Sequence, residues 1–338
     1  MADEHSHGVD NELLKKLEEA LFEIRRVIAG QEAMLERVLV CLLAGGHLLI
    51  EGVPGLAKTL TIKTTAAVLG GSFHRVQFTP DLVPSDLVGT RIYRPDKSDF
   101  ETELGPVFCN FLLADEINRA PAKVQSALLE VMQEHQVTIG HNTFMVPKPF
   151  LVLATQNPIE SEGTYALPEA QIDRFMLKIL VDYPAHDEEL TVVARSLEEP
   201  PELAQVLSLE ELTALQQQVT QVYVDPALIS WTVDVATATR RPAEHGFGEI
   251  ADYVSFGASP RGPISLVSAA RALALIRGRD YVVPGDVDAL VRDALRHRLV
   301  LSYRALAEEV APDTILDQVL AAMPTPQIDL GRAHAISS

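Results

Sequence analysis

The strongest signal for the fold of this chain is Leu48-Leu49-Ile50-Glu51-Gly52-Val53-Pro54-Gly55-Leu56-Ala57-Lys58-Thr59-Leu60. An apolar run of strand character enters a glycine turn there, and a helical pattern continues to Leu69. Strand, glycine loop and helix in this order are typical of a loop that cradles phosphate groups. Ala57 occupies the place where the general pattern has its last glycine, so the final bend of the loop must suit an alanine.

The chemistry of this loop favours a nucleotide bound with Mg²⁺. Gly52 and Gly55 permit a tight turn that directs backbone N–H groups at phosphates, and a helix begins there with its positive end. Lys58 can neutralise the β and γ oxygens, and the Thr59 hydroxyl can bind the metal. A plain Gly/Pro turn before a helix is the alternative. The predicted nucleotide-binding residues of this segment are Gly52, Val53, Pro54, Gly55, Leu56, Ala57, Lys58, Thr59 and Leu60.

A second apolar strand candidate, 111–114, ends in the two carboxylates of Asp115 and Glu116. Charges at the end of a buried strand are costly unless they meet a cation. At the carboxyl end of a parallel strand they face the same crevice as the glycine loop. We expect Asp115 to hold Mg²⁺ and Glu116 to polarise the attacking water. An acidic pair that merely precedes a helix is the alternative.

Three further polar residues follow at positions where they could reach a phosphate. Asn157 ends another apolar run, 150–154, and could position water or the γ-phosphate, although an asparagine before proline is also a common turn residue. Arg174 precedes the last strand candidate and could pair with Asp173 or reach a γ-phosphate on an adjacent subunit. Arg261 precedes a long helical pattern, where a cation is mildly unfavourable, which suggests an anionic partner.

Strand and helix patterns alternate up to residue 182 and then become helical throughout. Continuous apolar strands alternating with helices predict a doubly wound parallel α/β domain over 10–182, with a leading helix capped by Asp10. We predict a β-hairpin inserted at 137–148 and an elaborated loop at 79–110, which is rich in Pro, Gly and Asp. Residues 183–338 are predicted to form an all-helical lid, and residues 1–9 a disordered tail.

Composition and charge indicate which cellular compartment and which classes of partner to expect. Formal net charge is −19, from 28 basic and 47 acidic residues, so nucleic acid is not favoured as a partner. Cys41 and Cys109 are the two cysteines and lie far apart, as in a reduced protein. The longest apolar run, 38–50, is too short for the roughly twenty residues of a membrane span. We therefore expect a cytoplasmic protein without membrane insertion.

With these motifs in order, the chain resembles the MoxR family of AAA+ ATPases over about residues 20–310. Residues 113–120, Leu-Ala-Asp-Glu-Ile-Asn-Arg-Ala, look like the Walker B segment of that family. Residues 154–158, 163–165, 167–170 and 173–175 are similar to its stretch from sensor 1 to the arginine finger, and residues 257–261 to its sensor 2. Its members commonly have alanine before the loop lysine, so Ala57 fits the family pattern.

The resemblance implies roles that the residues alone leave open. It implies ATP as the nucleotide, with Asn157 as sensor 1, Arg174 as a finger acting on a neighbouring subunit and Arg261 as sensor 2. The segment 27–31, which ends at Gln31, resembles the part that packs against adenine. The resemblance also implies a hexameric ring that hydrolyses ATP as a chaperone-like remodelling or cofactor-insertion factor, beside client proteins and proteins with von Willebrand factor A domains.

Three rival interpretations stay open at this point. A magnesium-chelatase ATPase subunit would share these motifs and drive metal insertion. A nucleic-acid motor is a second rival, although the acidic charge argues against it. A nucleotide switch that does not hydrolyse ATP is the third, and it would leave Glu116 a structural role.

Overall fold

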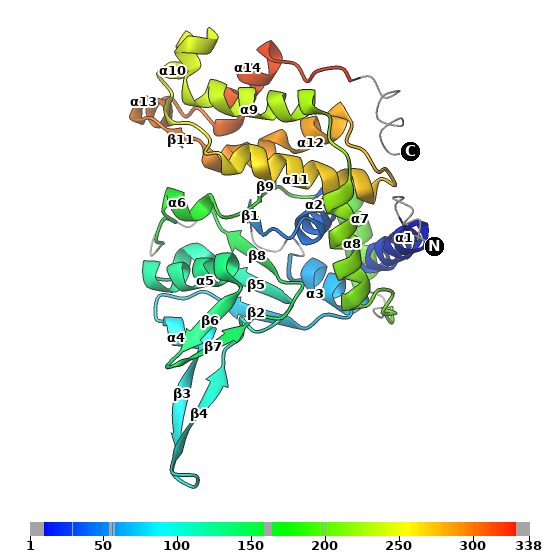
Figure 1. Cartoon of the computed structure of the whole chain (residues 1–338), viewed down its shortest axis with the longest axis vertical. Helices are drawn as coiled ribbons and strands as arrows, with labels where there is room; N and C mark the ends of the chain where they lie inside the picture. Colours follow the sequence, from blue (N-terminus) through cyan, green and yellow to red (C-terminus); the bar gives the residue numbers. More distant parts are fainter. Residues whose placement is uncertain are drawn as a thin grey trace, which may run out of the picture. The chain divides into compact units, whose positions relative to one another are not determined.

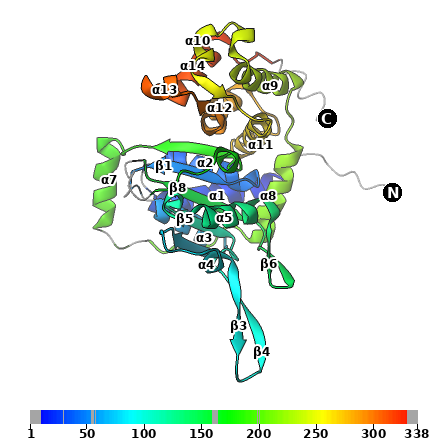
Figure 2. The same ribbon diagram turned by 90° about the vertical axis from the view of Figure 1, so that its left-hand side faces the viewer.

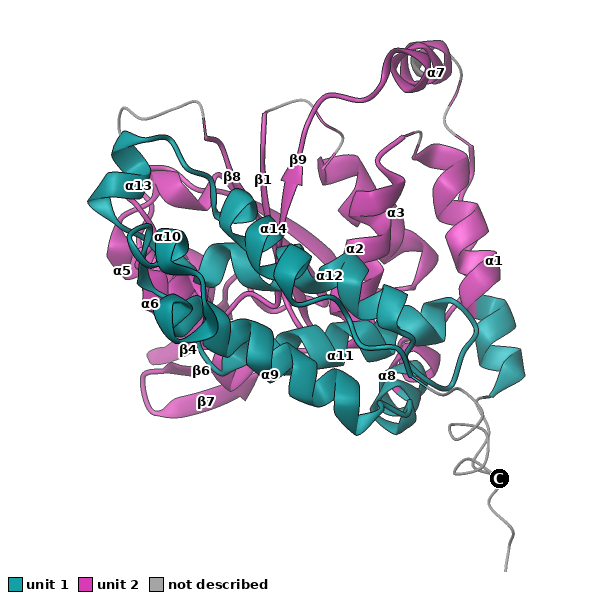
Figure 3. Ribbon diagram, turned by 90° about the horizontal axis from the view of Figure 1, so that it is seen from above, with its two compact units in different colours: residues 1–16, 214–338 teal, residues 17–213 magenta. Residues whose placement is uncertain are grey.

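The computed structural model describes residues 10–328, except 29, 54, 55, 57, 159–163, 198 and 200. The predicted tail 1–9 lies outside the described residues. The chain divides into two compact units, one formed by Leu17–Thr213 and the other by Met1–Lys16 with Ala214–Ser338 (Figure 3). Residues 183–213 thus belong with the sheet, whereas their helical pattern predicted them to be part of the lid. We call Leu17–Thr213 the sheet unit and 214–338 the lid unit.

The sheet unit is built on five parallel strands in the order β2-β5-β8-β1-β9 (Figure 1). Every residue of β5 and β8 except the last is buried, so their apolar runs need no alternation with polar residues. Strand β2 lies at an edge and is largely exposed. The predicted α/β fold with a parallel sheet is confirmed. The strands are β1 (Leu48–Gly52), β2 (Phe73–Gln77), β5 (Phe111–Asp115), β8 (Leu151–Gln156) and β9 (Leu177–Val181).

Helices precede, connect and follow these strands along the chain. Asp10 caps the first helix as predicted, because its Oδ1 accepts hydrogen bonds from the backbone N–H groups of Glu12 and Leu13 at 2.9 and 3.3 Å. None of the helices in the described part of the chain has the length and apolar character needed to cross a membrane. The helices are α1 (Asn11–Val27), α2 (Glu32–Leu43), α3 (Lys58–Val68), η1 (Ile117–Arg119), α5 (Ala122–Glu134), α6 (Glu169–Ile172), α7 (His186–Ser196) and α8 (Leu209–Gln221).

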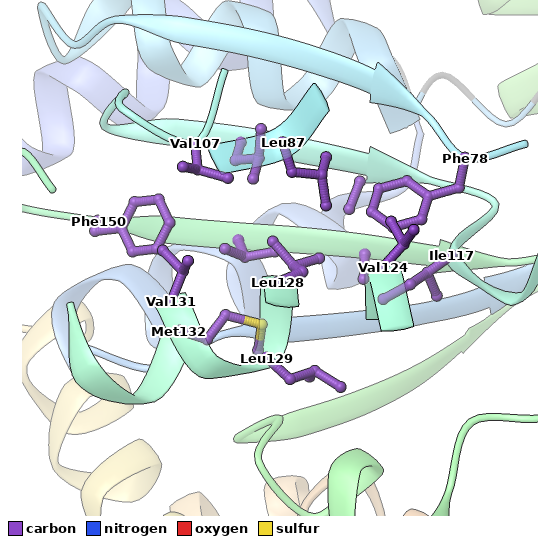
Figure 4. Close-up of a cluster of buried hydrophobic side chains, with 14 of the residues drawn as sticks. Phe78, Leu87, Val107, Ile117, Val124, Leu128, Leu129, Val131, Met132 and Phe150 are labelled. Atoms are coloured by element: carbon purple, nitrogen blue, oxygen red, sulfur yellow. The ribbon is translucent and has the colours of Figure 1, made fainter. Parts of the chain in front are cut away.

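One face of the sheet packs against α5 to form a continuous apolar core (Figure 4). Leu128 and Val124 of α5 are at most 1% exposed and meet side chains that alternate along β5 and β8. Phe78, just after β2, and Phe150, just before β8, are part of the same cluster. This core holds the carboxyl ends of the strands at fixed positions.

Two hairpins are inserted between the core strands. The predicted hairpin at 137–148 corresponds to β6 (Gln136–Ile139) and β7 (Asn142–Met145). The stretch predicted as a loop at 79–110 instead contains α4 (Pro84–Val88) and a second hairpin, β3 (Gly89–Arg94) with β4 (Asp99–Leu104), which extends away from the sheet (Figure 2). Most residues on both faces of this hairpin are at least partly exposed, so no apolar alternation marks its strands in the sequence.

The lid unit is mainly helical, and it also contains a small antiparallel ribbon that corrects the all-helical expectation. The ribbon pairs β10 (Val254–Phe256) with β11 (Val300–Leu301). Strands this short carry no detectable period, and β10 lies between glycines at 248 and 257. The other elements are α9 (Pro226–Arg240), η2 (Pro242–His245), α10 (Gly248–Ala251), α11 (Arg261–Ile276), α12 (Pro284–Leu295), η3 (Arg296–Arg298), α13 (Tyr303–Ala307) and α14 (Pro312–Ala322).

A buried carboxylate organises the start of α12 in the lid unit. Asp286 is fully buried, and it pairs with Arg277 at 3.0 Å and with Arg279 at 2.7 Å. Its Oδ2 also accepts a hydrogen bond from the Val283 backbone N–H at 2.9 Å, which caps the helix. A charge buried without such partners would be strongly destabilising, so this cluster stabilises the unit only as a whole.

Candidate functional site

A cavity of about 370 Å³ opens at the carboxyl ends of β1, β5 and β8 in the sheet unit. The carboxyl edge of a doubly wound parallel sheet is where such folds bind ligands, and the volume lies in the range of ligand pockets. The segments that line it are far apart in sequence. The described residues lining the cavity are Gly52, Leu56, Lys58, Thr59, Leu60, Arg75, Gln77, Asp115, Glu116, Thr155, Gln156 and Asn157.

Lys58 begins α3 at the mouth of the glycine loop. Its Nζ donates a hydrogen bond to the Gly52 carbonyl oxygen at 2.8 Å, which turns the side chain towards the end of β1. Burial lowers the pKa of the Lys58 ammonium, and the charges of Asp115 and Glu116 oppose that shift. The ammonium is therefore partly desolvated and close to two carboxylates, in the position expected of a phosphate ligand.

Both carboxylate oxygens of Asp115 accept strong hydrogen bonds. Oδ1 accepts from the Thr155 hydroxyl at 2.6 Å, across the neighbouring strand β8. Oδ2 accepts from Arg75 of β2, from Nη2 at 2.6 Å and from Nε at 3.2 Å. Donors from two adjacent strands therefore hold the carboxylate at the end of β5.

Glu116 is held by its backbone and by its carboxylate. Its φ of 55° lies in the left-handed region, which non-glycine residues rarely adopt, and its N–H donates to the Thr155 Oγ1 at 2.8 Å. The Oε2 atom accepts from Gln77 Nε2 at 2.7 Å and pairs with Arg119 Nε at 2.9 Å. The turn thus aims the second carboxylate into the cavity instead of continuing the strand.

Asn157 follows β8 directly, is 8% exposed and lines the same cavity. The structure therefore brings Lys58, Thr59, Asp115, Glu116 and Asn157 together on one surface. A carboxylate pair, a lysine, a hydroxyl and an amide around one cavity can bind a triphosphate and orient a water molecule at its terminal phosphate.

Several predicted residues are placed elsewhere or lie outside the described part of the chain. Gln31 and Val53 are not among the described residues that line the cavity, and Gln31 Nε2 donates to the Asp182 carbonyl oxygen at 3.3 Å. Arg174 follows α6, and within the described residues its buried Nε has no hydrogen-bond partner. Arg261 is exposed at the start of α11 in the lid unit. Pro54, Gly55 and Ala57 lie outside the described residues.

Sequence reasoning missed the side chains that hold the two carboxylates, namely Arg75, Gln77, Arg119 and Thr155. Arg75 and Gln77 lie on β2, where Gln77 stands beside Asp115 in the parallel register. A signal was present, because polar residues interrupt the otherwise apolar segment 73–78. Its meaning depends on β2 being the neighbour of β5, which only the tertiary structure reveals.

Comparison with known proteins identifies the class to which this fold and site belong. Residues 47–177 match the sequence model of the ATPase family associated with various cellular activities (AAA), and residues 249–319 match that of the AAA lid domain. The first match contains the cavity-lining residues, and the second contains α11 and α12 of the lid unit. The chain is thus an AAA-type ATPase with its lid, which supports nucleotide binding and ATPase activity in general.

Individual relatives show which family within the AAA class the chain belongs to. The chain is 56% identical to "Chaperone MoxR1" of Mycobacterium tuberculosis over 313 residues, which cover 93% of this chain and 83% of the relative. It is 33% identical to "Protein MoxR" of Paracoccus denitrificans over 89% of this chain and 93% of the relative. A crystal structure of a proposed ATPase from Cytophaga hutchinsonii superposes with a TM-score of 0.87 at 46% identity, covering 94% and 96% of the two chains. The chain belongs to the MoxR family of AAA+ ATPases.

Proposed function

We propose that this chain binds ATP with Mg²⁺ in the cavity of the sheet unit and hydrolyses the γ-phosphate. The observation that carries the proposal is the convergence of Lys58, Asp115 and Glu116 on one cavity from segments more than 50 residues apart. These residues have no common structural purpose at this edge of the sheet, since their charges would be satisfied more cheaply in solvent. A polyphosphate with its cation matches them in charge.

The residues present fit the metal that such a nucleotide carries. Thr59 supplies a hydroxyl oxygen and Asp115 a carboxylate oxygen to the same cavity, and Mg²⁺ prefers oxygen ligands. It is usually held by one or two protein groups together with phosphate oxygens, so two protein oxygens suffice. When bound, the metal would neutralise charge on the phosphates. Thr59 and Asp115 would hold it.

The remaining side chains would perform the chemistry. Glu116 would accept a hydrogen bond from the attacking water and draw off its proton as the water approaches the γ-phosphate. Asn157 would donate to the same water or to a γ-phosphate oxygen. Lys58 would stabilise the charge on the β and γ oxygens, because its ammonium is partly desolvated and therefore acts more strongly than in water.

We further propose that the active assembly is a ring, a hexamer by family resemblance, acting in the cytoplasm. Arg174 is not among the described residues lining the cavity of its own chain, so its proposed role at a γ-phosphate requires a second copy. Arg261 at the start of α11 would couple nucleotide to lid movement. Gln31 would lie beside the adenine.

For the biological role, we propose chaperone-like remodelling or cofactor insertion on client proteins, together with proteins that contain von Willebrand factor A domains. The name of the relative from Mycobacterium tuberculosis supports the chaperone role. Purification with a large chelatase subunit and porphyrin-dependent turnover would favour the chelatase alternative. DNA-stimulated turnover with strand separation would favour a nucleic-acid motor.

Steady-state phosphate release and nucleotide binding test the proposal together. Lys58→Ala should weaken binding of a fluorescent ATP analogue by about 10-fold to 100-fold, because a charge-assisted contact is lost. Lys63→Ala, an exposed lysine of the same helix, is the matched control. Glu116→Gln should retain ATP while phosphate release nearly stops.

Intact binding by Lys58→Ala would reject the loop assignment, and unchanged turnover by Glu116→Gln would reject its role with water. Wild-type protein that binds ATP without releasing phosphate would favour the switch interpretation. For the ring, Arg174→Ala and Glu116→Gln subunits mixed together should regain activity. No recovery in a mixed assembly of confirmed size would contradict action between subunits.

A further inference from the structure

Arg75 makes an ion pair with the carboxylate proposed to hold the metal. Its Nη2 lies 2.6 Å from Asp115 Oδ2, and its Nε lies 3.2 Å from the same oxygen. The other oxygen, Oδ1, accepts from the Thr155 hydroxyl at 2.6 Å. Both oxygens of Asp115 therefore accept hydrogen bonds from protein donors.

This pairing would compete with a metal ion for one oxygen of Asp115. A divalent cation at Oδ2 would compete with the two guanidinium N–H groups that this oxygen accepts, and the positive charges would repel each other. The Lys58 ammonium does not replace Arg75 here, because it donates to the Gly52 carbonyl. The Glu116 carboxylate has its own cation in Arg119, at 2.9 Å. Arg75 is thus the cation that pairs with the aspartate proposed to hold the metal.

We propose that Arg75 is a resting counter-ion, which neutralises Asp115 until Mg²⁺ arrives with the nucleotide and which must leave Oδ2 when the metal binds. The inference rests on the proposed function and adds a competition between an arginine and the metal for one carboxylate oxygen. It predicts that Arg75 weakens the binding of Mg²⁺ and stabilises the nucleotide-free site.

An exchange of Arg75 for Mg²⁺ requires a fixed carboxylate and a mobile guanidinium, and Asp115 and Arg75 differ in this way. The Asp115 side chain is 17% exposed and held by the sheet, whereas the Arg75 side chain is 49% exposed on an edge strand. A long side chain that is half in solvent can rotate away without disturbing the core, and its charge is then hydrated. Exposed ion pairs of this kind are weak, so we expect Arg75 to lower the apparent Mg²⁺ affinity by about twofold to fivefold.

A Mg²⁺ titration at a fixed concentration of fluorescent, non-hydrolysable ATP analogue tests this competition. Arg75→Met removes the guanidinium and keeps an unbranched apolar stem. Its half-saturating Mg²⁺ concentration should fall by about twofold to fivefold relative to wild type. Arg94→Met is the matched control, because Arg94 is 47% exposed and pairs with Glu101 in the β3–β4 hairpin. That control should leave the Mg²⁺ midpoint unchanged.

A second measurement uses the wild-type protein and needs no substitution. The Arg75 guanidinium Nε–H should change its NMR shift and exchange faster with solvent when Mg²⁺ and the analogue are added together. The analogue with EDTA should leave that signal as it is, since the aspartate then still lacks a competing cation.

The outcomes separate this inference from the proposed function. Failure of the wild-type protein to bind the analogue would overturn the proposed function, and this inference with it. Normal binding of the analogue by the wild type, with an unchanged or higher Mg²⁺ midpoint in Arg75→Met, would overturn only the proposal that Arg75 is a counter-ion. An Arg75 signal that does not respond to Mg²⁺ with analogue would do the same, even if Arg75→Met does not fold.

Discussion

Acidification should destabilise the sheet unit through one buried imidazole, that of His47. The residue is 5% exposed, its Nε2 lies 3.1 Å from the Met132 carbonyl oxygen, and its Nδ1 accepts from the Val152 N–H at 3.1 Å. A ring that donates at Nε2 and accepts at Nδ1 is neutral, and protonation would remove the acceptor. Burial lowers the pKa of His47 from 6.5 to about 4; the Met132 hydrogen bond opposes this shift, and the charge of His135 adds to it.

Proton linkage gives the direction and size of the effect. Because the folded pKa of His47 lies below the unfolded value, the unfolded chain binds more protons between the two values, and stability falls as pH drops. The contribution is fully present above the unfolded pKa of 6.5 and is lost as pH falls towards about 4. Between pH 7.5 and pH 5 the loss is about 2 kcal/mol, or about 30-fold in the unfolding constant.

Urea unfolding followed by far-UV circular dichroism at several pH values measures this slope. Hydrogen exchange of the Val152 amide, corrected for the intrinsic pH dependence, reports the same opening at the residue that bonds the ring. His47→Gln should be less stable at neutral pH and should lose most of the slope between pH 7.5 and pH 5. His141→Gln, at the exposed turn between β6 and β7, controls for the loss of an imidazole.

A slope in His47→Gln as steep as in the wild type would refute the reasoning, as would a corrected Val152 protection factor that does not change across this window. The folded pKa could then not lie far below the unfolded one, and the buried ring would have to accept a proton without cost.

Two further substitutions test close packing and a buried charge. Gly52→Ala should destabilise the sheet unit by about 1 to 3 kcal/mol in urea unfolding, because its Cβ would overlap a carbonyl oxygen of β9. Gly285→Ala, which would meet nothing within 4 Å, is the control. Asp286→Asn should destabilise the lid unit by about 3 to 5 kcal/mol, because two arginines would lose their buried partner. Trp231 fluorescence measures this loss, with the exposed Asp252→Asn as control.

Equal urea midpoints for Gly52→Ala and Gly285→Ala would show that β1 can move away from β9 at little cost. An Asp286→Asn protein as stable as Asp252→Asn would mean that the arginines find other partners. Either result would contradict the packing described for that unit.

A structural element could be predicted from the sequence where a local pattern of neighbouring residues marked it. The glycine loop, the apolar strand before Asp115 and the hairpin around residues 139–142 each combine a turn or strand signature with polar residues at a fixed offset. The β3–β4 hairpin and the β10–β11 ribbon were missed because their strands are exposed or very short, and neither condition leaves a period to detect.

The partners of the site residues depended on contacts across the sheet. That Arg75 pairs with Asp115 follows from β2 lying beside β5, although 40 residues separate the two in sequence. Thr155 likewise reaches both Asp115 and the Glu116 N–H only because β8 is the other neighbour of β5. Strand order is a property of the packed fold, so no local pattern contains it.

By itself, the sequence determined the chemistry available to this protein: a lysine after a glycine turn, two carboxylates after a buried strand, and an acidic chain without a membrane-spanning run. Those features depend on short-range sterics and on hydrophobic periodicity, and both can be recognised from neighbouring residues. Packing across the sheet fixed the features that no local pattern contains, namely which donors hold each carboxylate and where His47 is buried. Those outcomes depend on which strands lie side by side, and that is settled by burial of the whole core.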